Sequence, residues 1–391
     1  MFTAIFSTLP MFACLFWAIT FALDTRFDSR AKRFLALFMS VATVLYFCHA
    51  AYFNKEYGLY PITDSIYTFA TLAVFPLYYL YILVLSTPSR LPRKHFLVLL
   101  PSLLFCLSAI VIYRLMPEEV LRDYVLHWIY GDKSFADAPL LIKAQLIRYR
   151  LGSIVFTIQV VPILYWGSRR ISKYDKDINN YYSNTEGKTV SWINLILIVF
   201  VATSFSSFIM SIIGKEFFST SPLLLIIPSV LFGTLLYTLG YFGSKQNFTA
   251  IDFLAEVQKN DSLSITPPAE QIAKNSLSAA IIQLLEEKEL FRQSDIKISD
   301  VARMLGTNRT YVSESINKEM NLTFSELINK YRIEYAKELI RTAIRKGEDL
   351  NMYTVIEQSG FSAESSFYRV FKLMTGRTPK AWMTEMKNPL L

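Results

Sequence analysis

Charged residues are scarce in this chain of 391 residues. Asp, Glu, Lys and Arg make up 18% of it, against about 25% in ordinary soluble domains, whereas hydrophobic residues make up 52%. The chain has three cysteines, and each stands alone inside an apolar stretch: Cys14, Cys48 and Cys106. This placement excludes a disulfide framework and a metal site built on paired cysteines. The three histidines belong to no HExxH, Walker or other catalytic signature, so we predict neither an enzyme nor a cofactor.

The scarcity of charge is confined to the first 244 residues. Seven windows there contain no Asp, Glu, Lys or Arg: 1–23, 34–54, 65–89, 96–113, 151–168, 189–214 and 217–244. A helix that spans a bilayer needs about 20 apolar residues, with about 17 as the lower limit. A soluble protein with seven such windows would have almost no polar surface to present to water. We therefore predict a bundle of seven transmembrane helices, which makes the lipid bilayer the first partner.

The basic residues predict an orientation, because Lys and Arg collect in cytoplasmic loops. Twelve lie in the loops after the first, third and fifth windows, and the alternate loops hold fewer over more residues. The N-terminus is thus expected outside, and an odd number of crossings puts everything after residue 244 in the cytoplasm of a bacterium. A secretory signal peptide has basic residues before its apolar region, and no Lys or Arg precedes the first apolar run here. We therefore interpret this run as a retained helix of an inner-membrane protein.

The composition divides the chain into three parts: a transmembrane region at 1–243, a cytoplasmic linker at 244–273 and a soluble all-helical domain at 274–391. In the linker the apolar runs stop, and Thr266, Pro267 and Pro268 interrupt any helix. The net charge of +8 comes mainly from the membrane loops, so it does not itself indicate nucleic-acid binding.

The soluble domain begins with a helix-turn-helix pattern. A short helix at 300–305 stops at Gly306, and Asn308 caps a second helix at 309–320. Two short helices joined by a tight glycine turn form this motif, and the second helix is the recognition helix.

A longer helix at 325–344 follows, and Thr323 and Glu326 are spaced as a capping box at its start. About 20 residues at 1.5 Å per residue span about 30 Å. This length is close to the roughly 34 Å of one turn of duplex DNA, so recognition helices at its two ends would fit successive major grooves.

The plan then repeats. A helix at 354–359 reaches a turn at Gly360, and Ser362 is the expected cap of a helix that starts at Ala363. Helical spacing predicts an inward face made of Phe361, Phe367, Val370 and Phe371. The same spacing turns outward Glu364, Ser365, Tyr368, Arg369 and Lys372.

Both halves resemble the AraC/XylS family of transcription regulators. The stretch GFSAESSFYRVFKLMTGRTP, at 360–379, is similar to the family's second helix-turn-helix. The stretch LGTNRTYVSESINKEMNLTFSELINKYRIEYAKELI is similar to its first motif and connecting helix. The resemblance covers about 298–383 and departs at two positions: Glu314 stands where many relatives have a basic residue, and Asn321 replaces the usual glycine.

The resemblance implies which residues face DNA. Those expected to lie at base edges are Thr310, Ser313, Glu314, Glu364, Ser365, Ser366, Tyr368 and Arg369. Those expected to contact phosphates are Arg309, Lys318, Arg332, Lys337, Arg369 and Lys372. Solvated helix faces are the alternative for each basic residue, and Glu314 either accepts from cytosine N4 or weakens its half by repelling phosphate.

The resulting hypothesis is a membrane-tethered, sequence-specific transcription regulator that binds double-stranded DNA, works with RNA polymerase and is compatible with a homodimer. A small molecule or a membrane protein would induce it from the outer side. Residues expected to line a sensing pocket are Gln159, Asn194, His49, Pro76, Pro101, Pro162 and Pro228, and ordinary packing is their alternative. The alternative for the whole chain is a receptor or transporter-like protein whose helical tail docks a protein partner. Proteolytic release of the tail is a third possibility.

Overall fold

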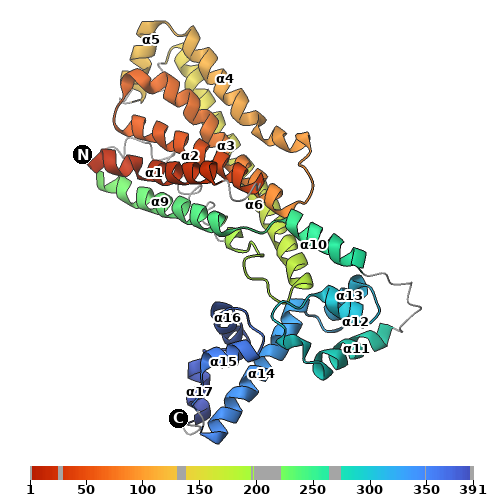
Figure 1. The fold of residues 1–391 in the computed structure, drawn as a ribbon. Helices are drawn as coiled ribbons and strands as arrows, with labels where there is room; N and C mark the ends of the chain where they lie inside the picture. The colour runs from red at the N-terminus through yellow and green to blue at the C-terminus, as the bar shows by residue number, and fades with distance from the viewer. Residues whose placement is uncertain are drawn as a thin grey trace. The chain divides into compact units, whose positions relative to one another are not determined.

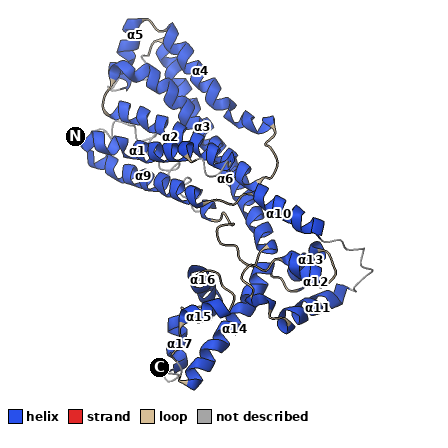
Figure 2. Cartoon of the chain, in the orientation of Figure 1, coloured by secondary structure: helices blue, strands red, loops and turns tan. Residues whose placement is uncertain are grey.

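The computed structural model describes residues 2–24, 30–129, 138–194, 197, 222–263, 274–347 and 349–387. Every regular element in these residues is a helix (Figure 2), which confirms the all-helical expectation over the described part of the chain. The chain forms two compact units. Unit 1 comprises Met1–Ser172 and Val190–Ile251, and unit 2 comprises Lys173–Thr189 and Asp252–Leu391.

Unit 1 is built mainly from long apolar helices (Figure 1). Its helices are α1 (Phe2–Leu23), α2 (Arg30–Phe53), α3 (Tyr60–Ser86), α4 (Leu100–Leu115), the short charged α5 (Glu118–Asp123), most of α6 (Leu140–Tyr181) and α9 (Pro222–Lys245). Shorter helical pieces of 3-10 or π type occur at Tyr57–Leu59, Arg93–Leu99 and Tyr124–Ile129. α1 packs against α2 and α9, and α3 packs against α2 and α4.

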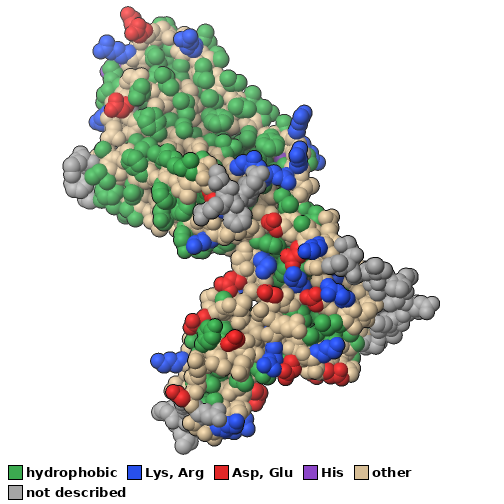
Figure 3. Space-filling model, viewed as in Figure 1, with side chains coloured by type: hydrophobic (Ala, Val, Ile, Leu, Met, Phe, Trp, Pro, Cys, Tyr) green, Lys and Arg blue, Asp and Glu red, His purple; other side chains and the backbone are tan. Residues whose placement is uncertain are grey.

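The central helix of this bundle is α3. In its most apolar window 78% of the residues are buried, against 17 to 39% in the other apolar helices of the described chain. The other helices expose large apolar side chains such as Phe12, Ile158 and Val161, which are 59, 65 and 66% exposed. Hydrophobic side chains accordingly cover the face of unit 1 that Figure 3 shows. Such a surface suits a lipid environment better than water.

Six helices in the described residues are long and apolar enough to cross a membrane. They correspond to six of the seven predicted windows. The remaining window, 189–214, falls mostly on residues outside those that the structure describes. The sequence thus predicts seven spans, and six of them have a described helix that fits.

The stretch 117–150 lies between the fourth and fifth apolar windows. Much of it is helical: α5 and the following π-helical turns lead to α6, which already begins at Leu140. Charge does not itself break a helix, and α6 continues through Arg148 because that side chain is buried against a carboxylate of α3. His127 near the start of this stretch lies 2.8 Å from the carboxylate of Asp123.

Unit 2 contains the second set of helices: α10 (Ala250–Leu263), α11 (Lys274–Glu287), η5 (Leu290–Arg292), α12 (Ile298–Met304), α13 (Arg309–Glu319), α14 (Phe324–Lys346), α15 (Met352–Gln358), α16 (Glu364–Thr375) and α17 (Pro379–Lys387). α14 is the axis of this part. α13 packs against it, as do α15, α16 and α17 (Figure 1).

Unit 2 has two clusters of buried side chains, one around each helix-turn-helix motif. Around α11 to α13 the buried side chains include Leu277, Ile281, Leu285, Val301, Val312 and Ile316. Around α14 to α16 a second cluster contains Ile333, Ala336, Ile340, Val355, Phe361, Phe367, Val370 and Phe371. The inward face predicted for the second recognition helix is thereby confirmed.

Candidate nucleic-acid interface and ligand cavity

The first helix-turn-helix consists of α12 and α13. Gly306 ends the turn between them with a φ of +63°, a conformation that a residue without a Cβ adopts readily. Asn308 caps α13 as predicted, because its side chain accepts a hydrogen bond from the Thr310 backbone N–H at 2.8 Å. Val312 and Ile316 are fully buried, so the opposite face of α13 is the one turned to solvent.

The outer face of α13 carries the residues predicted to read DNA. Thr310 and Glu314 are exposed, and Arg309 and Ser313 are half-buried. Glu314 lies 3.2 Å from Lys318 on the next turn. An exposed pair at this spacing contributes only about 0.3–0.5 kcal/mol, so it opens readily. Lys318 therefore masks the carboxylate of Glu314 without fixing it in place.

The second helix-turn-helix consists of α15 and α16, and its turn is tightly enclosed. Asn351 caps α15 by accepting from the Tyr353 N–H at 3.0 Å. Gly360 follows with a φ of +83°, and a Cβ there would lie 2.5 Å from the carbonyl oxygen of Phe291 and 2.7 Å from that of Arg292. Only glycine fits at this position, because both the backbone conformation and the space exclude a side chain.

The cap of α16 was predicted wrongly. The N-cap residue is Ala363, which makes no side-chain cap bond, and not Ser362. Phe361 is buried directly after Gly360, and Ser362 is exposed before the helix begins. Its hydroxyl instead accepts a hydrogen bond from Asn184 Nδ2 at 2.6 Å.

The outer face of α16 carries the second group of predicted DNA-facing residues. Glu364, Ser365, Arg369 and Lys372 are exposed, whereas Ser366 and Tyr368 are half-buried. Tyr368 packs against the core and meets the ring of Phe367 edge to face at 5.7 Å. The hydroxyls of Ser365 and Ser366 both donate to the carboxylate of Glu186, at 3.1 and 2.8 Å. The structure thus places part of this face against the segment Lys173–Thr189, which belongs to unit 2 although it precedes the rest of that unit in the chain.

The connection between the two motifs is α14. The predicted capping box is confirmed: Glu326 accepts from the Thr323 N–H at 2.7 Å, and the Glu326 N–H lies 3.3 Å from the Thr323 hydroxyl. The helix has 23 residues, which corresponds to about 35 Å at 1.5 Å per residue. Asn321, at the position where the resemblance to the AraC/XylS family leads to the expectation of glycine, has a φ of +53°, a conformation that asparagine adopts more easily than most residues.

Two of the predicted phosphate contacts are engaged inside the protein to different degrees. Arg332 is 2% exposed, and its guanidinium donates to the carbonyl oxygens of Phe291, Gln293 and Ser294 at 2.7, 2.8 and 3.1 Å. Burial lowers the pKa of Arg332 to about 10, which leaves it charged at neutral pH. Arg332 therefore stabilises the fold by binding backbone carbonyls and does not serve as a phosphate ligand. The side chain of Lys337 is 17% exposed and pairs with Glu334 at 2.8 Å.

Sequence reasoning missed two features of this surface. Tyr311 is 59% exposed on α13 beside Thr310, and its outward position follows from the helical spacing that was used for its neighbours. Asn184 and Glu186 were missed for a different reason. They contact α16 and the residue before its cap from 178 to 180 positions away in the chain, and no local pattern indicates a contact over such a separation.

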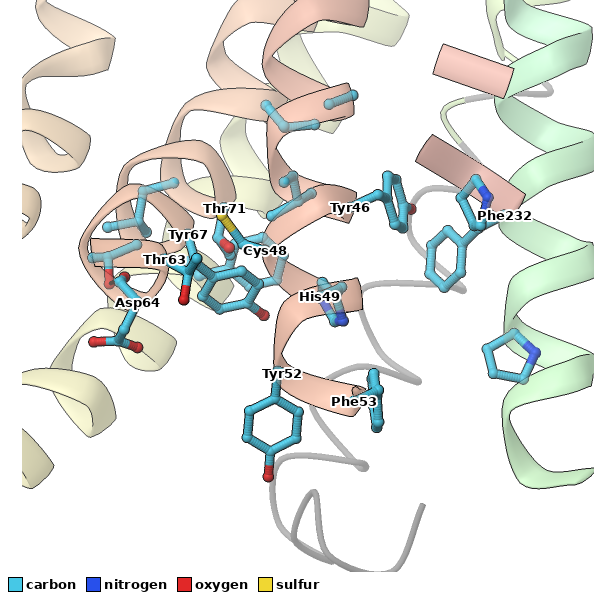
Figure 4. A pocket seen from close by; sticks show the side chains of 18 of the residues that line it. Tyr46, Cys48, His49, Tyr52, Phe53, Thr63, Asp64, Tyr67, Thr71 and Phe232 are labelled. Atoms are coloured by element: carbon cyan, nitrogen blue, oxygen red, sulfur yellow. Dashed lines mark hydrogen bonds between the residues drawn. The ribbon is translucent and has the colours of Figure 1, made fainter. Parts of the chain in front are cut away.

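Unit 1 contains a cavity of about 390 Å³ between α1, α2, α3, α6 and α9, a volume within the range of small-molecule sites. Its walls are mostly apolar and aromatic, with Tyr46, His49, Tyr67 and Phe232 around the space in Figure 4. Of the seven residues predicted to line such a pocket, His49 and Pro228 are in its wall. Gln159 instead donates to the Leu72 carbonyl at 3.1 Å.

A buried ion pair forms part of the cavity wall. Arg148 of α6 lies 2.6 Å from Asp64 of α3, and both side chains are 5% exposed. Arg148 also donates to Thr68 at 2.8 Å and to Gln145 at 2.6 Å, and the Tyr113 hydroxyl donates to Asp64 at 2.9 Å. Ionisable groups among apolar helices are costly and mark functional positions by default.

Comparison with known proteins locates one region of similarity. A family described as "Helix-turn-helix domain" matches residues 301–385. An uncharacterized HTH-type transcriptional regulator of Staphylococcus aureus (strain MSSA476) is 30% identical over 101 residues, which are 26% of this chain and 13% of that protein. The HTH-type regulator YtdP of Bacillus subtilis (strain 168) is 27% identical over 96 residues, 25% of this chain and 12% of the relative.

This chain spans only about an eighth of the length of these relatives. No solved structure matches the chain. The residues that the family matches cover the two motifs and the helix that joins them. The C-terminal part of the chain is a helix-turn-helix domain of the AraC type, of the kind found in HTH-type transcriptional regulators.

Proposed function

We propose that this chain is a membrane-tethered transcription regulator that binds promoter DNA through α13 and α16. The observation that carries this proposal is the repeat of one motif at both ends of α14. The connecting helix α14 is about 35 Å long for its 23 residues, and one turn of duplex measures about 34 Å. A connecting helix of that length gives two recognition helices room to meet successive major grooves on one side of the DNA.

The residues proposed to contact DNA are those predicted from the sequence: Arg309, Thr310, Ser313, Glu314, Glu364, Ser365, Ser366, Tyr368, Arg369 and Lys372. Exposure supports Thr310, Glu314, Glu364, Ser365, Arg369 and Lys372 most directly. Arg369 and Lys372 supply salt-dependent attraction to phosphates, and the hydroxyls and carboxylates face base edges.

The tether is proposed from the apolar helices of unit 1. Seven spans within 1–243 start from an outer N-terminus, and a linker at 244–273 then leads to the DNA-binding domain at 274–391 in the cytoplasm. The six described helices that are long enough to span support this arrangement. A phosphatase or fluorescent-protein reporter fused after Leu391 tests it, since only a cytoplasmic C-terminus is compatible with chromosomal DNA.

The signal is proposed to enter through the cavity of unit 1. Its aromatic walls and buried Asp64–Arg148 pair suit a small amphipathic molecule with an apolar body and a hydrogen-bonding head. A library of such amphiphiles should raise the melting temperature of the purified protein, and Thr71→Phe should abolish the rise by filling the space. Ser40→Phe, on the exposed side of α2, is the matched control. Equal responses of both variants would refute the cavity as the site.

DNA binding is tested with the full chain in nanodiscs and fluorescent duplexes selected from a random-sequence library. We expect affinity that falls steeply with salt, and a loss of about tenfold or more for Arg369→Ala. Arg345→Ala, an exposed arginine near the end of α14, controls for charge and should stay near the parent. The absence of any selected duplex would favour the alternative, a tail that docks a protein partner. RNA polymerase and a second copy of the chain are further proposed partners.

A further inference from the structure

A segment between two apolar stretches packs into the helix-turn-helix domain. Residues 173–189 belong to unit 2 by their contacts, although the sequence places them between the fifth and sixth apolar windows. Tyr181, Tyr182 and Ser183 are 2 to 3% exposed. The segment is thus an integral part of the folded unit rather than a solvated loop.

Ser183 anchors the segment through its backbone and its side chain. Its N–H donates to the Ile296 carbonyl at 3.2 Å, and its own carbonyl accepts from the Ser325 hydroxyl at 3.2 Å. The Ser183 hydroxyl donates to the Ser294 carbonyl and accepts from Arg332, both at 3.3 Å. Four hydrogen bonds therefore hold this residue to the loop before α12 and to the start of α14.

The two tyrosines extend the contact to α10. The Tyr182 hydroxyl donates to Glu256 at 2.6 Å, and Asn260 donates to the Tyr181 hydroxyl at 2.8 Å. Both rings also meet Phe253, with centroids 5.4 and 6.1 Å apart. Burial and the bond to Glu256 raise the pKa of Tyr182 well above its ordinary value, so the hydroxyl keeps its proton and remains a donor.

The end of the segment reaches the second recognition helix. Asn184 donates to Ser362 at 2.6 Å, and its side-chain oxygen accepts from the Glu186 N–H at 3.1 Å. The turn continues through Gly187 with a φ of +70°. This geometry aims the Glu186 carboxylate at the first turn of α16, where its two oxygens accept from Ser365 and Ser366 separately.

A carboxylate that accepts from two hydroxyls at the start of a helix presents the same acceptor chemistry as a phosphate. The first turn of a helix favours an anion through its free N–H groups and its dipole. A DNA phosphate or a base acceptor would use the same two hydroxyls. The Glu186 carboxylate and a DNA phosphate cannot bind these hydroxyls at the same time. Each hydroxyl donates one hydrogen bond, and the two negative charges would repel each other.

We propose that residues 173–189 hold the second helix-turn-helix in a DNA-excluding state, with Glu186 as an internal competitor of DNA for Ser365 and Ser366. Withdrawal of this segment from α16 frees the second half-site. The segment includes the C-terminal end of α6, and the same helix carries Arg148 of the cavity wall. A change in unit 1 therefore has a covalent route to the contact. This inference rests on the proposed DNA binding and specifies how that binding is regulated.

The test compares Glu186→Ala with Glu357→Ala in the full chain in nanodiscs. Glu357 is an exposed carboxylate on α15, so its removal changes the charge of the same motif without touching the segment. The probe is a fluorescent duplex selected from a random-sequence library with the Glu186→Ala protein. We expect Glu186→Ala to bind it about tenfold more tightly than the parent, and Glu357→Ala to stay within about twofold.

A cross-link supplies a readout that does not depend on DNA. The pair Asn184→Cys and Ser362→Cys replaces two side chains in direct contact, and a short bifunctional thiol reagent should join them in high yield. The joined protein should lose affinity for the duplex and regain it when the link is cleaved.

Equal affinities of the Glu186 and Glu357 variants, or weaker binding by Glu186→Ala, would overturn the competitor role. Failure of the cysteines to join would overturn the docking itself. A protein that forms the link while no variant binds any duplex would refute the proposed function and the DNA-excluding role together.

Discussion

The two helix-turn-helix motifs follow one plan and differ in what surrounds them. Gly306 turns the first in open space, where a Cβ would meet no atom within 4 Å, whereas Gly360 turns the second against two backbone carbonyls. Ser313 and Glu314 of α13 bond within their own helix in the described chain, whereas Ser365 and Ser366 of α16 bond to Glu186. The same pattern of residues therefore yields one recognition helix that is open to solvent and one that is engaged.

The largest expected effect is a loss of stability in the second motif, with the first motif left folded. Gly360→Ala would meet carbonyl oxygens at 2.5 and 2.7 Å in a left-handed conformation, and we expect a loss of about 3 kcal/mol or more. Gly306→Ala meets only the conformational cost, about 1 kcal/mol. Hydrogen exchange by mass spectrometry on the full chain should show α15 and α16 opening only in the Gly360 variant. Equal protection in both variants would contradict the packing of the second turn.

Arg332 offers the next largest effect, because it bonds to the loop before α12 and to the 173–189 segment and lies over the ring of Phe361. Arg332→Met removes the donor for three backbone carbonyls and for Ser183, and we expect a loss of about 2–4 kcal/mol. Hydrogen exchange should rise both in 181–184 and in the loop before α12. Arg345→Met, with an exposed side chain, should change stability by less than about 0.5 kcal/mol. An Arg332→Met protein as stable as the parent would contradict this structural role.

The smallest expected effect concerns Glu314 on the open helix. Glu314→Gln removes a carboxylate near the groove and releases Lys318, its partner at 3.2 Å. We expect DNA affinity to rise about two- to fivefold, with a salt slope steeper by about one phosphate contact. Titrations of selected duplexes at several salt concentrations measure both. A change confined to one base identity would instead assign Glu314 to reading cytosine.

The local features of unit 2 were predictable because they depend on residues close together in the chain. Asn308 caps α13 and the Thr323–Glu326 box opens α14, since both bonds close over two or three residues. The inward rings of Phe361, Phe367 and Phe371 follow from helical spacing alone. Ser362 was misread because a capping residue type stood one position before the true N-cap, and the burial of Phe361 decides where the helix begins.

The sequence by itself determined that the chain is helical, that its first part is apolar enough for six described spans, and that two motifs flank α14. Helical periodicity and helix caps depend on residues three or four positions apart, so they can be predicted from the local sequence. Only the tertiary structure decided that Arg332 lies inside and that Glu186 meets Ser365 and Ser366. These contacts join residues that are far apart in the chain, and their free energy exists only once the unit has folded around them.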